Sequence, residues 1–360
     1  MRTAFRQSLA ATLAAAGMLS LGLIAACNSK SGPQTTMLNG AGSTFVYPVM
    51  SRWTEIFNGM HPNIRINYQS IGSGGGVQQV KAGTVDFGAS DYALDDQALS
   101  QMKPVIQIPE SAGPVCITYN LPGLQKPLQL SADVIAGIFL GKITSWHDGA
   151  IAKDNPGVKL PDTKIVPVHR TDGSGTTAAF TTYLSTVSDD WKTKVGKGGS
   201  VSWPGGVGGK GSEGVTEQVR QAPGSIAYVE LTYAQQNKLP TAAVKNQAGH
   251  YVLPTLKSAT AAIDAYAKEL SSDSRTPIVN PPASAADAYP ISTLTFLIIP
   301  KDGTDAAKRT ALKQFATYII HLGQAEAEAL NYAPLPESVR QYDQQQLNQM
   351  TTNGAPIQEQ

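Results

Sequence analysis

Residues 170–177, Arg-Thr-Asp-Gly-Ser-Gly-Thr-Thr, connect an apolar strand to a helix in the predicted fold. The apolar residues of 165–168 are typical of a short strand, and those of 180–184 fall at the i, i+3 and i+4 spacing of a helix. The helix is therefore predicted to begin near Ser174 or Thr176. A strand, a polar turn and a helix in this order indicate an α/β fold.

The start of this helix offers several hydrogen-bond donors. The first N–H groups of a helix have no partner within it, and the helix dipole adds partial positive charge. The hydroxyls of Ser174, Thr176 and Thr177 add donors, and Arg170 adds a fixed charge. The turn therefore predicts a site for a small oxyanion. The alternative is an ordinary Ser/Thr helix cap without a ligand.

Two further stretches repeat this arrangement. Residues 40–45, Gly-Ala-Gly-Ser-Thr-Phe, lead into an amphipathic helix whose first turn accommodates Pro48. Residues 71–76, Ile-Gly-Ser-Gly-Gly-Gly, follow an alternating strand at 64–68 and lead into another helix. One such turn is an ordinary helix start, but three of them predict a shared anion site.

Asp91 is the acid expected nearest to these donors. It lies in residues 85–92, Val-Asp-Phe-Gly-Ala-Ser-Asp-Tyr, which we predict to be a strand followed by a loop. An ionised carboxylate accepts hydrogen bonds and donates none. The alternative for Asp91 is a solvated carboxylate in a surface loop.

Residues 1–26 have the pattern of a signal peptide. Arg2 and Arg6 precede an apolar run, and small residues lead to Cys27. A cysteine at this place predicts a lipoprotein, cleaved before Cys27 and acylated on its thiol. A single membrane-spanning anchor is the alternative, because the run is close to the lower length limit for spanning. Residues 27–37 are then a tether.

Composition narrows the class of protein. Without the signal peptide, 26 basic residues stand against 27 acidic ones, so the net charge changes from +1 to −1 and no nucleic-acid partner is indicated. Besides Cys27, the chain has one cysteine, Cys116, in an apolar run, so no disulfide framework is expected. The remaining length, about 330 residues, predicts two domains.

Strands and helices alternate through the rest of the chain. Apolar runs at 105–108 and 115–119, separated by 109–114, predict two strands and a crossing into a second domain. Further helices are predicted at 133–140, 215–220, 259–270 and 306–330, and further strands at 224–229 and 294–299. The glycine-rich residues 194–214 are predicted to form a surface loop. They do not fit a nucleotide phosphate loop, because Pro204 and Gly211 stand where that pattern needs Gly and Ser or Thr.

The sequence offers little support for catalysis. The five histidines are scattered without metal-ligand spacing, so no metal or cofactor is expected, and His169 is predicted to pack or to form a surface hydrogen bond. A serine hydrolase or phosphatase acting on phosphate esters is the enzymatic alternative. However, none of Ser43, Ser73 and Ser174 lies at the centre of a Gly-x-Ser-x-Gly turn.

Seven motifs together resemble one family, the phosphate-specific substrate-binding proteins (PstS) of bacterial ABC transporters. They occur in order between residues 38 and 340, as Gly-Ala-Gly-Ser-Thr-Phe (40–45), Ile-Gly-Ser-Gly-Gly-Gly-Val (71–77), Val-Asp-Phe-Gly-Ala-Ser-Asp (85–91), Arg-Thr-Asp-Gly-Ser-Gly-Thr (170–176), Val-Ser-Trp-Pro-Gly-Gly-Val-Gly-Gly-Lys-Gly (201–211), Ile-Ala-Tyr-Val-Glu (226–230) and Asn-Tyr-Ala-Pro-Leu-Pro-Glu-Ser-Val (331–339).

The resemblance implies a ligand set for phosphate and a fold. The set comprises backbone N–H groups, hydroxyls, one guanidinium and one carboxylate, from Ser43, Thr44, Phe45, Ser73, Asp91, Arg170, Ser174, Gly175 and Thr176. The implied fold is the two-lobed α/β fold of periplasmic binding proteins (type II-like). Each lobe is a mixed sheet flanked by helices, and the ligand cleft lies between them. Residues 38–110 with 288–360 are expected to form lobe 1, and 111–287 lobe 2.

The resemblance also implies what the protein does. It is expected to bind inorganic phosphate outside the cytoplasmic membrane, as a lipid-anchored monomer, and to pass it to the permease and ATPase subunits of an ABC importer. Two other classes remain open, the hydrolase named above and a structural or scavenging surface lipoprotein that binds no anion tightly.

Overall fold

The central element of the fold is an eight-stranded mixed sheet. The structure, a computed structural model, describes residues 35–124 and 126–357. The strands follow one another across the sheet in the order β2 (Ile64–Ser70), β1 (Thr36–Gly42), β3 (Phe87–Ser90), β11 (Ser292–Pro300), β4 (Val105–Tyr119), β8 (Ser225–Glu230), β6 (Val166–Arg170) and β7 (Val207–Gly209). Smaller sheets comprise β10 (Tyr251–Val252), β9 (Ala243–Lys245) and β5 (Gln129–Leu130), and β12 (Thr351–Thr352) with β13 (Ala355–Pro356).

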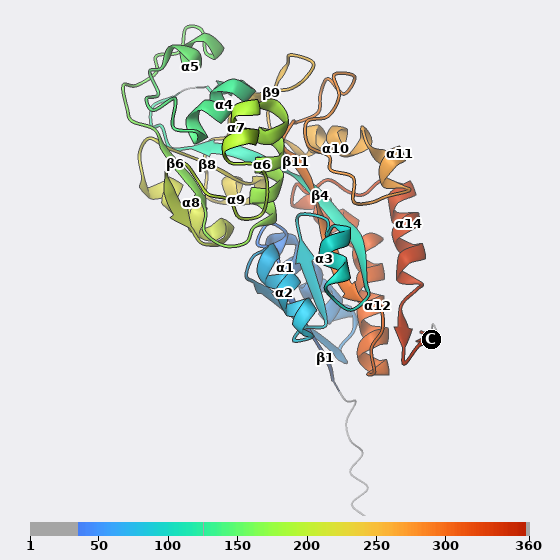
Figure 1. Ribbon diagram of the computed structural model, residues 1–360. Coiled ribbons are helices and arrows are strands. Elements are labelled where there is room, and N and C mark those ends of the chain that lie inside the picture. Colours follow the sequence, from blue (N-terminus) through green and yellow to red (C-terminus); the bar gives the residue numbers. More distant parts are fainter. Residues whose placement is uncertain (1–34, 125, 358–360) are drawn as a thin grey trace, which may run out of the picture. The chain divides into compact units, whose positions relative to one another are not determined.

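Strand β4 divides the sheet into two halves (Figure 1). Its residues 105–114 pair with β11, and its residues 115–119 pair with β8, both antiparallel. We call β2, β1, β3, β11 and residues 105–114 the first half, and residues 115–119, β8, β6 and β7 the second half. The described residues nevertheless pack as one unit.

The strand directions bring the carboxyl ends of both halves together. Strands β1, β2 and β3 are mutually parallel and, through β11, run in the same direction as β4. Strands β6, β7 and β8 run against β4. Because β4 extends from the first half into the second, the carboxyl ends of β1, β2 and β3 point towards those of β6, β7 and β8. Ligands of α/β sheets bind at carboxyl ends of strands, so this is where a site is expected.

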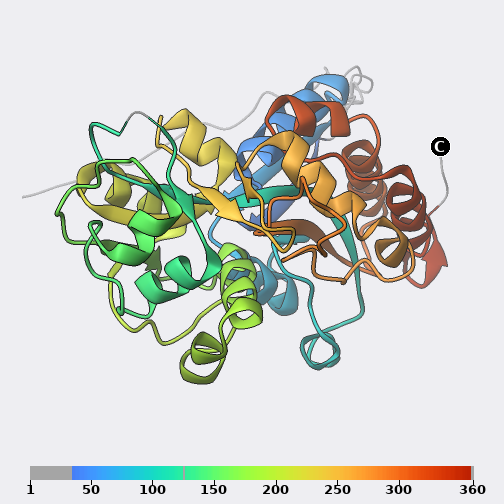
Figure 2. The ribbon, with the colours of Figure 1, turned by 90° about the horizontal axis from the view of Figure 1, so that it is seen from above.

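The helices cover the two halves separately. Helices of residues 132–221 gather over the second half, and those of residues 306–347 over the first (Figure 2). Their bounds are α1 (Tyr47–Met60), α2 (Ser73–Ala82), α3 (Asp96–Ser100), α4 (Ala132–Phe139), α5 (Gly149–Asp154), α6 (Gly175–Val187), α7 (Asp189–Lys194), α8 (Gly211–Gln221), α9 (Leu231–Gln236), α10 (Leu256–Asp264), α11 (Ala267–Leu270), α12 (Ala306–Ile320), α13 (Gln324–Ala329) and α14 (Glu337–Leu347).

The predicted strand–turn–helix at residues 165–184 is confirmed. Strand β6 ends at Arg170, and α6 begins at Gly175 with Ser174 as its N-cap. Pro48 lies in the first turn of α1, as expected. His169 stacks on Trp203, with ring centroids 4.8 Å apart, which confirms a packing role. Cys116 is buried and free in β4.

The prediction of two separate strands at 105–108 and 115–119 is wrong. Both belong to β4, although two prolines lie between them. Pro109 lies beside a register shift in the pairing with β11, and Pro114 lies where β4 exchanges β11 for β8. Proline lacks an N–H donor, so a strand tolerates it at such irregular positions.

Two predicted helices are interrupted. Residues 306–330 form α12 and α13, and Leu322, which lies between them, is 72% exposed. The Trp53 indole N–H donates to the Gly323 carbonyl at 2.7 Å, which holds this turn against α1. Residues 259–270 likewise divide into α10 and α11.

The glycine-rich residues 194–214 contain a strand and a helix start that we did not predict. They include β7 at the edge of the sheet and the first turn of α8, whose Gly211 and Ser212 are buried. A surface loop was the wrong prediction for this part, because the β6–β7 pairing depends on contacts outside the segment.

Near the start of the described residues, β1 begins at Thr36, inside the range predicted as a tether. Cys27 lies outside the described residues.

Glu110 is a fully buried carboxyl in the irregular part of β4. The pairing with β11 passes from Pro109 opposite Phe296 to Ser111 opposite Thr295, so Glu110 is the extra residue of a bulge. One of its oxygens accepts from the Thr295 hydroxyl at 3.0 Å, and the other has no partner among the described residues. Burial raises the pKa of Glu110 to about 8, with a further contribution from the charge of Asp91.

We expect the stability of the protein to fall as the pH rises, in part because of Glu110. The unfolded chain releases this proton near the ordinary glutamate pKa of 4.5, whereas the folded protein keeps it up to about 8. The folded state therefore binds more protons in that range, and Glu110 contributes a loss of about 1 kcal/mol per pH unit. Urea unfolding in phosphate-free buffer from pH 5 to pH 8 measures the slope.

Glu110→Gln is expected to reduce this slope by about that amount, since the amide does not titrate. Glu328→Gln, at an exposed position, is the matched control and should leave the slope unchanged. Equal slopes in the wild type and Glu110→Gln would contradict the assignment.

Candidate functional site

The nine residues predicted to bind an anion lie together where the two halves of the sheet meet. All nine are buried: Ser43, Thr44, Phe45, Ser73, Asp91, Arg170, Ser174, Gly175 and Thr176. Hydrogen bonds join the halves here. The Gly175 N–H donates to the Ser73 hydroxyl at 3.1 Å, and the Thr176 hydroxyl donates to Asp91 at 3.4 Å. The three stretches singled out in the sequence therefore converge.

The three helix starts differ in which residue caps the helix and in where they place the predicted ligands. At α6, the Ser174 hydroxyl accepts from the Thr177 N–H at 3.1 Å and caps the helix. At α2, Ser73 is the first helical residue, and it follows Gly72, whose φ of 87° suits glycine. At α1 the N-cap is Val46, so Ser43 and Thr44 belong to a turn just ahead of the helix rather than to its cap. This turn places the N–H groups of residues 44 and 45 outside any regular element.

Asp91 lies at the centre of the hydroxyl groups. It is 2% exposed, so the alternative of a solvated loop carboxylate is wrong. It accepts from the Ser43 hydroxyl and, at 3.3 Å, from the Ser73 hydroxyl, in addition to Thr176. Burial raises the pKa of Asp91 to about 6, against the opposing effects of the Ser43 hydrogen bond and the Arg170 charge. At neutral pH it is therefore chiefly a buried carboxylate, the one acceptor-only side chain among these donors.

Arg170 is held by Asp172, which the sequence prediction omitted. Its Nε donates to one Asp172 oxygen at 2.8 Å and its Nη2 to the other at 2.5 Å. Burial lowers the pKa of Arg170, but the hydrogen bond and charge of Asp172 outweigh it and raise the pKa overall. Asp172 also accepts from the Gly211 N–H at 3.0 Å. An acid two residues after an arginine at the end of a strand is the signal that was available, since both can lie on one face.

Ser212 is a second residue that the sequence prediction missed. Its N–H donates to the Thr44 hydroxyl oxygen at 3.1 Å, and the two hydroxyls lie 2.8 Å apart. The start of α8 therefore contacts the 43–45 turn across the two halves. The Gly-Ser pair at 211–212 was the available signal, but we assigned it to a surface loop.

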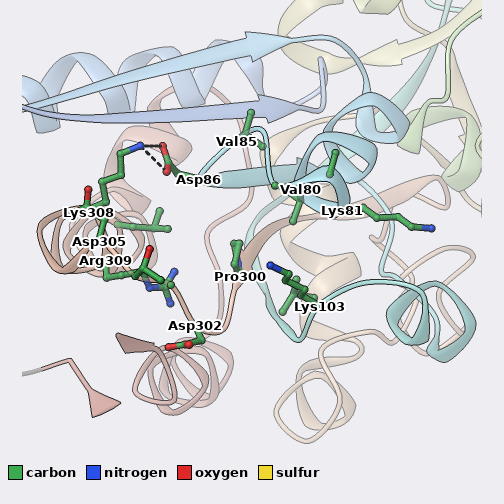
Figure 3. A pocket seen from close by; sticks show the side chains of 16 residues that line it. Val80, Lys81, Val85, Asp86, Lys103, Pro300, Asp302, Asp305, Lys308 and Arg309 are labelled. Atoms are coloured by element: carbon green, nitrogen blue, oxygen red, sulfur yellow. Dashed lines mark hydrogen bonds and ion pairs between the residues drawn. The ribbon is translucent and has the colours of Figure 1, made fainter. Parts of the chain in front are cut away.

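A cavity elsewhere in the fold does not share this convergence of buried donors. This cavity has a volume of about 440 Å³ and lies at the amino end of β4 and the carboxyl end of β11. Figure 3 shows the side chains that line it. Three of its charged groups make contacts within the fold: Lys308 pairs with Asp86 at 3.0 Å, and Arg309 donates to the carbonyls of Thr351 and Lys301. Buried donors from both halves converge at Asp91 and not in this cavity.

Residues 35–124 and 126–357 contain neither a metal cluster nor a spanning helix. No group of three or more His, Cys, Asp or Glu side chains there is arranged to hold a metal ion. Within the same residues, no helix is both long and apolar enough to cross a membrane.

Comparison with known proteins places the chain in a family. A model of the PBP superfamily domain matches residues 28–321. The phosphate-binding protein PstS of Xylella fastidiosa is 47% identical over 307 residues, which cover 85% of this chain and 83% of that protein. The phosphate-binding protein PstS of Pasteurella multocida is 42% identical over 314 residues, covering 87% and 90%.

A solved structure supports the fold. The phosphate-binding protein of Stenotrophomonas maltophilia superposes with a TM-score of 0.67 at 19% identity, over 89% of this chain and 97% of that one. At this identity the likeness concerns the fold, which is the two-lobed α/β fold expected from the sequence. The family model and the close relatives together decide the family: the chain belongs to the PBP superfamily and, within it, to the PstS family of phosphate-binding proteins.

Proposed function

We propose that this protein binds inorganic phosphate outside the cytoplasmic membrane and delivers it to an ABC-type importer. The observation that carries the proposal is the donor set buried between the two halves, with Asp91 as its one acceptor-only side chain. A tetrahedral oxyanion that still carries protons needs many donors and at least one acceptor. Membership of the PstS family supports the same ligand.

Each predicted ligand has a role in this proposal. The N–H groups of Thr44 and Phe45 and the hydroxyls of Ser43, Thr44 and Ser73 bind from the first half. The Arg170 guanidinium and the helix start at Ser174, Gly175 and Thr176 bind from the second half. Asp91 accepts a hydrogen bond from a protonated phosphate oxygen. Asp172 and Ser212 support Arg170 and Thr44 through the contacts described above.

The proposed mechanism is closure of two lobes around the ligand. We assign residues 38–110 and 288–360 to lobe 1 and residues 111–287 to lobe 2. Strand β4 and the segment leading into β11 connect them. Phosphate contacts both lobes only when they are closed, so its binding shifts the open–closed equilibrium towards the closed state. The permease and ATPase subunits of the importer are the partners in this proposal.

Isothermal titration with phosphate and with sulfate tests the function. We expect tight binding of phosphate and weak or no binding of sulfate. Failure to bind either anion would favour a structural or scavenging lipoprotein. Incubation with phosphomonoesters and carboxylic esters tests the hydrolase alternative, and turnover at catalytic rates would overturn the receptor proposal. Among the described residues, the hydroxyls of Ser43 and Ser73 hydrogen-bond to Asp91 rather than to a histidine base.

We further propose that Cys27 carries the lipid anchor. Cys27→Ser is expected to leave the signal peptide uncleaved by a lipoprotein peptidase and to abolish fatty-acid incorporation, because the serine hydroxyl does not replace the acylated thiol. Metabolic labelling with a fatty acid measures this. Phosphate binding by the purified variant should equal that of the wild type, and labelling of the variant to the wild-type level would refute the anchor.

A further inference from the structure

Three consecutive carbonyl groups of the 43–45 turn each accept a hydrogen bond from a tyrosine hydroxyl. Tyr68 donates to the Ser43 carbonyl at 2.9 Å. Tyr233 donates to the Thr44 carbonyl at 2.8 Å. Tyr332 donates to the Phe45 carbonyl at 2.6 Å.

These tyrosines come from three distant parts of the chain. Tyr68 lies in β2, Tyr233 in α9, and Tyr332 in the segment after α13. Tyr233 and Tyr332 are almost completely buried, and Tyr68 is partly buried. Burial raises the pKa of all three, so their hydroxyls remain protonated donors at physiological pH. The carbonyls of this turn are therefore paired with side-chain donors from distant parts of the chain, and not with backbone N–H groups close in sequence.

The geometry of the peptide bond relates each carbonyl to an N–H group of the proposed site. In a trans peptide the C=O of one residue and the N–H of the next point in opposite directions. The Ser43 carbonyl therefore shares a peptide plane with the Thr44 N–H, and the Thr44 carbonyl shares one with the Phe45 N–H. These are the two backbone donors proposed for phosphate. A hydrogen bond to the carbonyl also polarises the N–H of the same plane.

The third peptide plane closes the turn. The Phe45 carbonyl shares its plane with the Val46 N–H, which donates to the Ser43 hydroxyl oxygen at 3.3 Å. Tyr332 therefore holds the peptide plane whose N–H is hydrogen-bonded to the Ser43 side chain. Each of the three planes then has a donor fixed behind its carbonyl and an N–H on the opposite side.

We propose that Tyr68, Tyr233 and Tyr332 are positioning residues of the anion site, which hold the 43–45 turn so that its N–H groups point at the bound phosphate. The proposal rests on the proposed function and adds residues that do not touch the ligand. Tyr233 has a second acceptor, since Glu213 lies 2.8 Å from its hydroxyl. Its one proton is shared, so Tyr68 is the clearest position for a test.

Tyr68→Phe removes only the hydroxyl that holds the Thr44 peptide plane. We expect the Kd for phosphate to rise about tenfold, because the plane loses a hydrogen bond of typical strength. Tyr332→Phe, which acts on a plane that does not donate to the ligand, should raise it less. Tyr183→Phe is the matched control, because the Tyr183 hydroxyl is buried without a partner among the described residues, and its Kd should stay at the wild-type value.

Isothermal titration with phosphate gives the affinities. Amide ¹H–¹⁵N spectra of the phosphate-saturated proteins report the hydrogen bonding of the Thr44 and Phe45 N–H groups. In Tyr68→Phe the Thr44 amide proton should move upfield more than the Phe45 amide proton, which a general loss of stability would not produce. The proposal is overturned if the wild type binds phosphate and Tyr68→Phe matches Tyr183→Phe in Kd and in the Thr44 signal. If the wild type binds no phosphate, the proposed function itself fails, so the two failures are distinguishable.

Discussion

Asp91→Asn is expected to bind phosphate measurably but to lose most of its discrimination against sulfate. Phosphate near neutral pH carries one or two protons, whereas sulfate carries none. In the proposed site, the ionised Asp91 accepts a hydrogen bond from a protonated phosphate oxygen, in a charge-assisted bond of the strong kind. Towards sulfate the same carboxylate meets a bare oxygen in a buried site. That repulsion costs several kcal/mol, enough for a preference of about a thousandfold.

The asparagine side chain removes this asymmetry. Its amide oxygen still accepts from a protonated phosphate, and its NH₂ group donates to sulfate. Competition titrations of the two anions against the wild type and the variant measure the preference. Asp287→Asn, at an exposed position, is the control and should keep the wild-type preference. If Asp91→Asn rejects sulfate as strongly as the wild type does, Asp91 is not the selectivity element.

The pH dependence of the preference for phosphate over sulfate is a second test of the same prediction. Burial raises the pKa of Asp91 to about 6, so the carboxyl gains a proton as the pH falls through that value. A protonated carboxyl donates to sulfate, and the preference for phosphate should therefore weaken in the wild type below about pH 6. In Asp91→Asn, which has no titrating group at this position, the preference should not follow this pH profile.

Gly175→Ala is expected to weaken phosphate binding about ten- to a hundredfold. A Cβ at position 175 would lie 2.6 Å from the Asp91 Cβ and 2.7 Å from the Ser73 Oγ. Gly175 belongs to the second half of the sheet, and the other two belong to the first, so the clash opposes closure of the proposed lobes. Overpacking of this kind costs about 1–3 kcal/mol.

The effect should appear in binding more than in folding. The proposed open state separates these residues, so the unfolding midpoint of the phosphate-free variant should stay close to that of the wild type. Gly149→Ala is the matched control: Gly149 is likewise the first residue of a helix, and an added Cβ there meets no atom within 4 Å. Isothermal titration and thermal unfolding measure the two properties. Wild-type affinity in Gly175→Ala would show that binding does not require this close contact.

Much of the site was predictable because it depends on neighbours in the sequence. The passage from β6 through residues 171–174 into α6 follows from apolar spacing, a serine cap and glycines. The same local logic identified Ser43 and Ser73. The order of strands and helices indicated an α/β fold, in which ligands meet the carboxyl ends of strands. These features involve residues only a few positions apart, so the sequence by itself determined them.

The tertiary structure decided the features that depend on distant partners. Residues 105–119 form one strand because β11 and β8 supply its two sets of hydrogen bonds, despite Pro109 and Pro114. The turn after α12 is held against α1 by the Trp53 side chain, 270 residues earlier in the chain than Gly323. Asp91 is buried and Ser212 reaches Thr44 only because the two halves face each other. Local patterns do not encode such contacts, since each partner could be satisfied by water until the chain has folded.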